Sequence, residues 1–202
     1  MQSLLIRRYE PADLPALYHI CHATGLNGGD ASSEVSDPQL IGHIYAAPYA
    51  VLEPESASVV VLDDTVVGYL LATVDSARFH ERSEQAWFPA LRARYPVPPA
   101  ADSSTVAMFI RALHRGHPPP ADSIMRAYPA HLHIDLLPVA QGLGAGRRLM
   151  DRLFAQLRGQ RLPGVHLYVA RANQPAIAFY ERIGFTRIDE NDGAIGYGYA
   201  LT

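Results

Sequence analysis

The stretch His131–Leu157, HLHIDLLPVAQGLGAGRRLMDRLFAQL, has the pattern of a strand, a glycine-rich turn and a helix. In its first part Leu132, Ile134 and Leu136 alternate with polar residues, which is typical of a strand with one apolar face. Its last part carries an apolar stripe at a spacing near 3.6 residues, as an amphipathic helix does. The stripe consists of Leu149, Met150, Leu153, Phe154 and Leu157.

Three glycines separate the strand from the helix, within Gln141-Gly-Leu-Gly-Ala-Gly146. The first amides of a helix have no internal partners, and the helix dipole adds positive charge there. Glycine lets a bulky anion approach that backbone closely, so the turn is a candidate pyrophosphate site. A turn that uses glycine only to reverse direction is the alternative. No Lys-Ser/Thr follows as in a Walker loop, and the spacing misses G-x-G-x-x-G, which disfavours a nucleotide-binding α/β protein.

A second segment follows at Asn173-Gln-Pro-Ala176-Ile-Ala-Phe179-Tyr180-Glu-Arg-Ile-Gly184-Phe185. It resembles the N-x-x-A-x-x-F-Y-x-x-x-G-F segment of the GNAT superfamily of N-acetyltransferases. The turn is similar to the Q/R-x-x-G-x-G/A segment of the same family, and Ile134-x-Leu136-x-Pro138 matches the usual end of its fourth strand. The resemblance covers roughly residues 131–190 and brings two motifs in the family's order.

The resemblance implies a single acetyltransferase-like domain over residues 1–202, with an α/β (α+β) GNAT-like fold. Its centre would be a mixed, mostly antiparallel seven-stranded sheet flanked by helices, with a helical insert at about 75–129, between strands 3 and 4. We expect strands at 4–9, 58–62, 66–74, 131–136, 165–169, 185–190 and 195–201, with hairpin turns at Asp63-Asp64-Thr65 and Asn191-Asp-Gly193. We expect helices from Pro11, at about 37–45, at 76–88 with a stop or kink at Pro89, at 105–113, 122–128 and 174–183, and a loop at 25–33.

The long insert and the run HPPPAD…YPAHLHIDLLP suggest a narrower relationship. They resemble the acetyltransferase-like C-terminal domain of eukaryotic O-GlcNAcase and its free-standing bacterial relatives. The region around Asp30 and Glu34 corresponds to the part of the family fold that covers the acceptor, although a solvated loop with ordinary caps is the preferred interpretation.

The family resemblance implies acetyl-CoA as co-substrate and an unidentified amine, on a small molecule or a protein, as acceptor. The pyrophosphate would lie on the turn and the pantetheine on the end of the fourth strand. Pro138 has no amide, so Leu137 and Val139 would provide the donors. The expected cofactor-binding residues are Leu136, Leu137, Val139, Gln141, Gly142, Leu143, Gly144, Ala145, Gly146, Arg147, Asn173 and Tyr180.

Three residues are the catalytic candidates. Tyr180 matches the position that often protonates the departing thiolate, and a hydrogen bond to that thiolate is its safer role because a phenol is less acidic than a thiol. Asp135 occupies a position where the family often carries its acidic base, and His133, on the same strand face, titrates near neutrality and would serve or assist. The alternatives are packing for Tyr180 and ordinary surface or core contacts for the other two. His131-x-His133-x-Asp135 lacks further ligands, so no metal is expected.

Composition excludes several classes of function. The net charge of −3 gives no reason to expect a nucleic acid or an anionic membrane as partner. A single cysteine, Cys21, excludes an internal disulfide framework, and Arg7 interrupts the N-terminus before an apolar signal region forms. We therefore expect a cytoplasmic N-acetyltransferase that works by direct transfer. The alternative is a module that binds acetyl-CoA and catalyses little. The sequence indicates no oligomeric state.

Overall fold

Seven strands form one mixed sheet in the order β1-β2-β3-β4-β5-β7-β6 in the computed structural model, which describes residues 4–191 and 193–201. All neighbouring strands are antiparallel except β4 and β5, which are parallel. The fold class predicted from the sequence is therefore confirmed. The strands are β1 Leu4–Arg8, β2 Ala57–Leu62, β3 Thr65–Thr73, β4 Ala130–Leu136, β5 Gly164–Ala170, β6 Thr186–Glu190 and β7 Ala194–Ala200.

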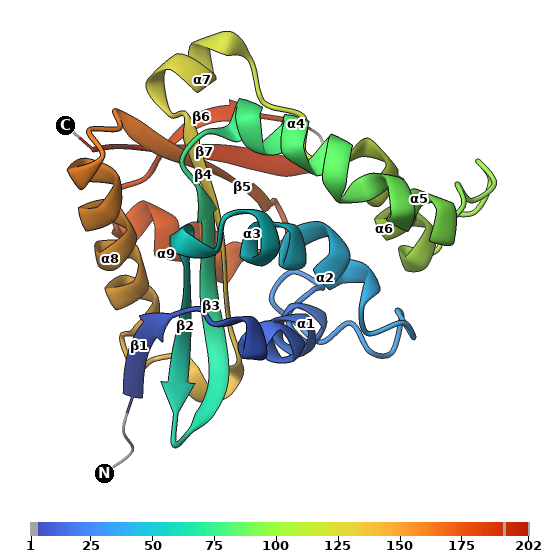
Figure 1. Cartoon of the computed structure of the whole chain (residues 1–202), viewed down its shortest axis with the longest axis horizontal. Helices are drawn as coiled ribbons and strands as arrows, with labels where there is room; N and C mark the ends of the chain where they lie inside the picture. Colours follow the sequence, from blue (N-terminus) through green and yellow to red (C-terminus); the bar gives the residue numbers. More distant parts are fainter. Residues whose placement is uncertain (1–3, 192, 202) are drawn as a thin grey trace.

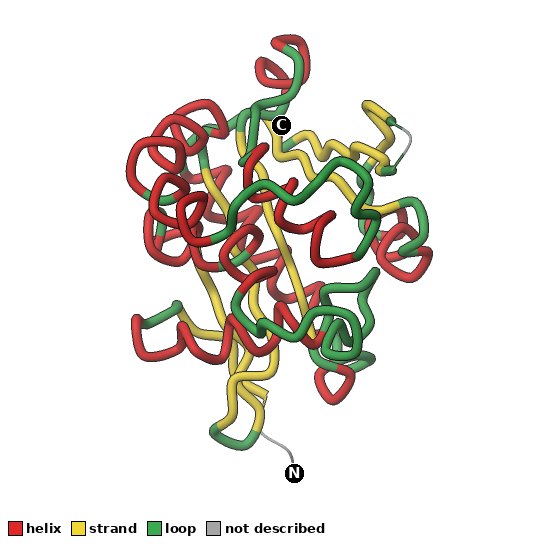
Figure 2. The backbone as a smooth tube through the Cα atoms, turned by 90° about the vertical axis from the view of Figure 1, so that its right-hand side faces the viewer, coloured by secondary structure: helices red, strands yellow, loops and turns green. Residues whose placement is uncertain are grey.

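Helices cover both faces of this sheet (Figures 1 and 2), and in Figure 1 β2 to β4 run up the view while β5 to β7 cross its upper part. One face carries α8 and α9, and the other carries α1 to α6 (Figure 1). The helices are α1 Leu14–Ala23, α2 Leu40–Tyr45, α3 Ala47–Leu52, α4 Ser76–Ala86, α5 Phe88–Arg94, α6 Thr105–Arg115, α7 Asp122–Ala127, α8 Ala145–Gly159 and α9 Gln174–Arg182. Three 3-10 turns precede or join them, η1 Pro11–Asp13, η2 Pro54–Ser56 and η3 Pro138–Ala140.

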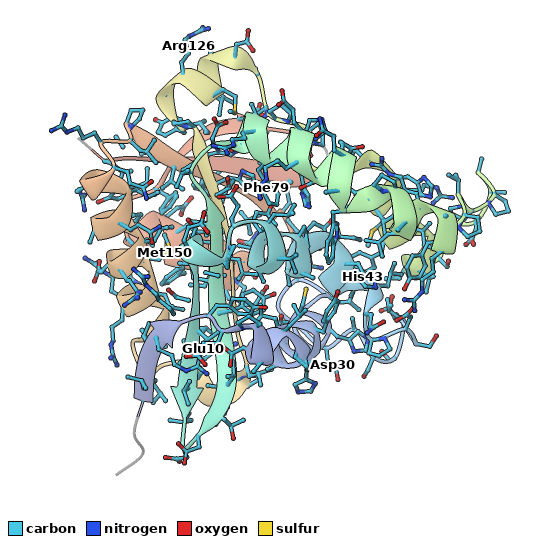
Figure 3. All side chains as sticks on the ribbon, in the orientation of Figure 1. Glu10, Asp30, His43, Phe79, Arg126 and Met150 are labelled. Carbon is cyan, nitrogen blue, oxygen red and sulfur yellow. The ribbon has the colours of Figure 1, made fainter. Side chains whose placement is uncertain are left out.

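The alternation of side chains along the strands builds two separate cores. Leu132 of β4 packs with Leu70 of β3 against α8 and α9, while Tyr69 and Leu71 of β3 pack against α1 to α6. Met150 of α8 and Phe79 of α4 lie on the two sides of the sheet (Figure 3). The polar face of β4 is thus turned toward α1 to α6, and its apolar face toward α8 and α9.

The parallel strands β4 and β5 pair over only two positions, Ala130 with Val165 and His131 with His166. Beyond these pairs, the edge of β4 that faces β5 is unpaired as far as Leu136, where β4 ends. Strand β5 continues to Ala170 and is paired there only with β7. The sheet therefore opens between the C-terminal halves of β4 and β5. Both sequence motifs follow directly after this opening, at the start of α8 and of α9.

The insert between β3 and β4 is helical, as the sequence predicts. It holds α4 to α7, and Pro89 lies at the start of α5, where the helical segment breaks. Two helices were not expected, α5 and α3. Helix α3 follows α2 after a single residue and has Pro48 near its start, where the missing amide costs nothing. The predicted turn at Asn191-Asp-Gly193 includes residue 192, which lies outside the described residues. In the part of the chain that is described, no helix combines the length and apolar character needed to cross a membrane.

Candidate active site

The glycine turn begins α8 with an exposed backbone. Gly142 and Gly144 have φ values of +74° and +75°, a region that favours glycine, and a Cβ at either would meet nothing within 4 Å. Gly144 is the N-cap residue of α8, so the amides of the next three residues have no intrahelical acceptor. The turn thus presents free donors to open space, as an anion site requires.

Two apolar side chains beside this turn are exposed, Val139 at 53% and Leu143 at 47%. Exposed residues of this size next to a polar backbone site fit a ligand that has both a charged and an apolar part. Arg147 forms an ion pair with Asp151, 2.8 Å apart, and both side chains are at least half exposed. A pair so exposed is weak, so the Arg147 guanidinium is easily released toward an anion at the turn.

Backbone hydrogen bonds fix which groups of β4 remain available at the opening. The Leu137 amide donates to the Val67 carbonyl oxygen of β3 at 2.9 Å. It is therefore not free to donate to pantetheine, contrary to what the sequence predicts. Because successive residues of a strand direct their backbone groups to opposite edges, Leu136 faces the opening toward β5. The Leu136 carbonyl oxygen accepts a bond from the Gln141 side-chain amide at 3.0 Å.

Asp135 is a partly buried carboxyl group in this region. It lies on the face of α1 to α6, opposite Tyr69 in the antiparallel register, and the Tyr69 hydroxyl donates to its Oδ2 at 2.5 Å. Burial raises the pKa of Asp135, while the Tyr69 hydrogen bond and then the nearby Thr24 hydroxyl act in the opposite direction. A desolvated carboxylate with a raised pKa is a better proton acceptor than an exposed one.

Tyr180 approaches from the other face of the sheet. It lies in α9, is 7% exposed, and packs against Phe179 and Phe185 with ring centroids 5.5 and 5.6 Å away. Burial and then the nearby Asp135 carboxylate raise the pKa of Tyr180, so its hydroxyl stays protonated at neutral pH. Among the described residues this hydroxyl has no hydrogen-bond partner. Asp135 and Tyr180 are therefore coupled electrostatically through the sheet at its opening.

Asn173 fixes the start of α9. Its side-chain oxygen accepts a hydrogen bond from the Ala176 amide at 3.2 Å, which makes it an N-cap. A Cβ at Gly28, in the loop that follows α1, would be 3.7 Å from the Asn173 side chain. The loop predicted to cover the acceptor therefore lies next to the helix that carries Tyr180. Asp30 of that loop binds Ser32, and Glu34 accepts a bond from Thr105 of α6.

The two histidines of β4 differ in their surroundings. His131 is hydrogen bonded at both ring nitrogens, to the Tyr49 hydroxyl at 2.7 Å and the Ser76 hydroxyl at 2.6 Å. His133 has only ring contacts. Burial lowers the pKa of His133 to about 3, with nearby His117 as the second cause. A neutral imidazole of such low basicity is a poor proton acceptor at neutral pH, which leaves Asp135 as the better candidate for the base.

Sequence reasoning missed the residues that hold Asp135. Tyr69 lies in a strand that was predicted, but only the register of β3 against β4 places it opposite Asp135. Thr24 lies at the end of α1, and no local pattern distinguishes it from an ordinary helix end. Within residues 4–191 and 193–201, no three side chains of the metal-binding types are grouped to hold an ion.

The sequence is similar to two kinds of known protein. The chain is 22% identical over 189 residues to rat (Rattus norvegicus) protein O-GlcNAcase, covering 93% of this chain but only 20%, about a fifth, of that protein's length. It is 52% identical over 50 residues to a mycothiol acetyltransferase of Thermomonospora curvata, which is 25% of this chain and 17% of that protein.

A solved structure of SsHAT has 39% sequence identity and a TM-score of 0.90, with 99% of each chain covered. This likeness spans the insert and both motifs. A family model described as the acetyltransferase (GNAT) family matches residues 32–185 of the chain. The chain belongs to the GNAT acetyltransferase family.

Proposed function

We propose that the chain is an acetyl-CoA-dependent N-acetyltransferase that transfers the acetyl group directly to a primary amine. One observation carries this proposal: the Asp135 carboxyl group and the Tyr180 hydroxyl come from opposite faces of the sheet at the place where β4 and β5 separate. They are near enough for the Asp135 charge to act on Tyr180, whose hydroxyl has no hydrogen-bond partner among the described residues. A base for the amine and a donor for the leaving thiolate are the two groups that the transfer needs.

The cofactor site follows from the same opening. The pyrophosphate of acetyl-CoA would accept bonds from the amides of residues 142–147, and Val139 and Leu143 would contact its apolar parts. The pantetheine would enter between β4 and β5 and pair with backbone groups of Leu136, displacing the Gln141 side chain from the Leu136 carbonyl oxygen. The match of the chain to the GNAT acetyltransferase family supports acetyl-CoA as the acyl donor.

The reaction would proceed by attack of the amine nitrogen on the thioester carbonyl carbon. An alkylammonium of pKa ~10.4 requires about 4–5 kcal/mol to lose its proton at pH 7, so Asp135 would accept this proton directly or through water. The C–S bond then breaks, and the sulfur takes the electron pair while the Tyr180 hydroxyl donates a hydrogen bond to it. Cys21 is 2% exposed and burial raises the pKa of its thiol, so it is a poor nucleophile. The direct transfer needs no acyl-cysteine intermediate.

Amine-dependent release of coenzyme A thiol from acetyl-CoA tests the proposal. We expect the wild type to release thiol in proportion to acetylated amine, and Tyr180→Phe to lower kcat at least tenfold while the Kd for acetyl-CoA changes less than twofold. Phe179→Leu, a change of the neighbouring ring, is the matched control. Acetyl-CoA binding without any amine-dependent release would instead identify a binding module.

A further inference from the structure

A second set of hydrogen-bonding groups lies beside Asp135 on the same face of β4. His133 is two residues away, which places the two Cα atoms about 6.6 Å apart. His133 is partly exposed, and among the described residues neither of its ring nitrogens has a hydrogen-bond partner. A neutral imidazole offers one donor and one acceptor, and both are available here.

The Tyr45 ring lies against His133, with centroids 5.5 Å apart. Tyr45 ends α2 and is partly exposed, and within the described chain its hydroxyl is also without a hydrogen-bond partner. The neighbouring tyrosine hydroxyls are used: Tyr49 bonds to His131, and Tyr69 donates to Asp135. His133 and Tyr45 are therefore the unsatisfied polar pair beside the proposed base.

The polar side chains on this face of β4, His131, His133 and Asp135, differ in how many hydrogen-bond partners they have. His131 is bonded at both nitrogens by Tyr49 and Ser76, so its part of β4 is sealed beneath α3 and α4. His133 and Asp135 still have free hydrogen-bonding capacity. Buried or half-buried groups of this kind normally find partners, and a bound molecule would supply them.

The rings that contact the pair are aromatic and carry no charge at neutral pH, and the charged group that acts on Tyr45 is the Arg115 guanidinium, which is positive. Tyr45 contacts Phe109 of α6 and His117, with ring centroids 6.5 and 6.1 Å away. Burial lowers the pKa of His117 to about 4, so it is neutral at pH 7. If the acceptor carried a second positive charge, that charge would lose its water of hydration against these rings and would find no carboxylate there, so binding would cost free energy. An alkyl group there would leave His133 and Tyr45 unpaired.

This inference rests on the proposed function. We propose that His133 and Tyr45 form the subsite that recognises the acceptor. The acceptor is then a primary amine with an uncharged hydroxyl or amide group a few bonds from its nitrogen. The amine lies at Asp135, and the second group bonds to His133 and Tyr45. Diamines and simple alkylamines are the poorer acceptors. His133 thereby acts in substrate recognition, while Asp135 receives the proton.

Three amines that differ only at the far end of one five-carbon chain test this subsite. They are 5-amino-1-pentanol, hexylamine and 1,5-diaminopentane. Their binding is measured by calorimetry on the protein saturated with desulfo-coenzyme A, which cannot donate acetyl, and their kcat/KM by thiol release. We expect 5-amino-1-pentanol to bind about fivefold more tightly than hexylamine, and the diamine to bind most weakly.

Tyr45→Phe and His133→Phe remove the polar atoms and keep a ring, and we expect each to abolish the preference for the alcohol over hexylamine. His133→Gln, which retains a donor and an acceptor, restores part of that preference. Tyr9→Phe is the matched control, since it removes a tyrosine hydroxyl just after β1, three strands away from β4 in the sheet, and it keeps the preference.

Equal binding of the three amines, or a preference that survives Tyr45→Phe and His133→Phe, would overturn the subsite. Failure of the proposed function looks different. If the amines bind in the expected order but no thiol is released, the subsite stands and the transfer step is wrong. If acetyl-CoA itself does not bind, the cofactor site is wrong.

Discussion

Asp135 is the proposed base of the reaction. Burial raises its pKa, so the deprotonated form needed to accept a proton is lost at a higher pH than for an exposed carboxyl group. We expect kcat/KM to fall as the pH decreases through that raised pKa. Asp135→Asn should lower kcat at least about 100-fold and remove this acidic limb, with the Kd for acetyl-CoA nearly unchanged.

The matched control for this variant is Asp64→Asn, in the turn between β2 and β3. Asp64 has a φ of +65°, a conformation that asparagine also tolerates, so the fold should be unaffected. Steady-state rates on one amine over a range of pH values distinguish the two variants. Full turnover in Asp135→Asn would show that another group is the base.

Tyr69 positions Asp135 without touching the reacting atoms. Its hydroxyl donates to the carboxylate and opposes the effect of burial on the Asp135 pKa. Tyr69→Phe removes this bond, so the pKa of Asp135 should rise and the acidic limb of kcat/KM should move to higher pH. The shift would be absent if Tyr69 only fills space. Cys21→Ala, a neighbour of Tyr69 in the same core, is the control.

Single residues were predicted well where local sequence decides them. Asp135, His133 and Leu136 were placed on the correct strand faces by alternation alone, and the glycines of the turn were found by spacing. Tyr69, Tyr45 and Thr24 were not found because their roles depend on contacts between segments distant in sequence. The low basicity of His133 follows from burial by α2 and the insert, which alternation does not reveal.

Helix α9 is the element that carries Tyr180, and Asn173 caps it. Asn173→Ala should lower the free energy of unfolding by about 1 kcal/mol, because the Ala176 amide loses its acceptor. Asn173→Ser restores a cap with a shorter side chain. Thermal unfolding and acetyl-CoA titration of both variants separate two roles. A serine variant with normal stability but a raised Kd would indicate that Asn173 contacts the cofactor directly.

The predicted strands and helices match the structure where the pattern is long and regular, as in β3, β4 and α8. The short helix α3 was missed because Pro48 and the brief α2–α3 junction look like a loop in sequence. The separation of β4 and β5 was not predicted from the sequence. Nothing in either strand taken alone marks where their pairing ends.

The whole molecule buries neutral histidines between its sheet and the insert. Burial lowers the pKa of His117 to about 4 and that of His133 to about 3, whereas an unfolded histidine titrates near ~6.5. The unfolded chain therefore binds more protons between these values, and stability present above pH ~6.5 is lost as the pH falls. Burial also lowers the pKa of His131 well below its usual range, so at least three histidines follow this trend, and the raised pKa of Asp135 opposes it.

Unfolding by urea, followed through the fluorescence of the single tryptophan, Trp87, measures this dependence. Each histidine that stays neutral in the folded state should lower the free energy of unfolding by about 1.6 kcal/mol between pH 6.5 and 5, so His117, His131 and His133 together lower it by about 5 kcal/mol. His117→Phe should remove about a third of that change, and the exposed His19→Gln should leave it unchanged. A stability independent of pH over this range would contradict neutral burial.

Calorimetric titration with acetyl-CoA is the most direct test of the site at the opening between β4 and β5. We expect saturable one-to-one binding by the wild type and its loss in Gly144→Glu, which places a carboxylate where the pyrophosphate would lie. Gly159→Glu, at the other end of α8, is the control, since a Cβ there also meets nothing within 4 Å. Absence of binding by the wild type, or unchanged binding in Gly144→Glu, would contradict the proposed cofactor site.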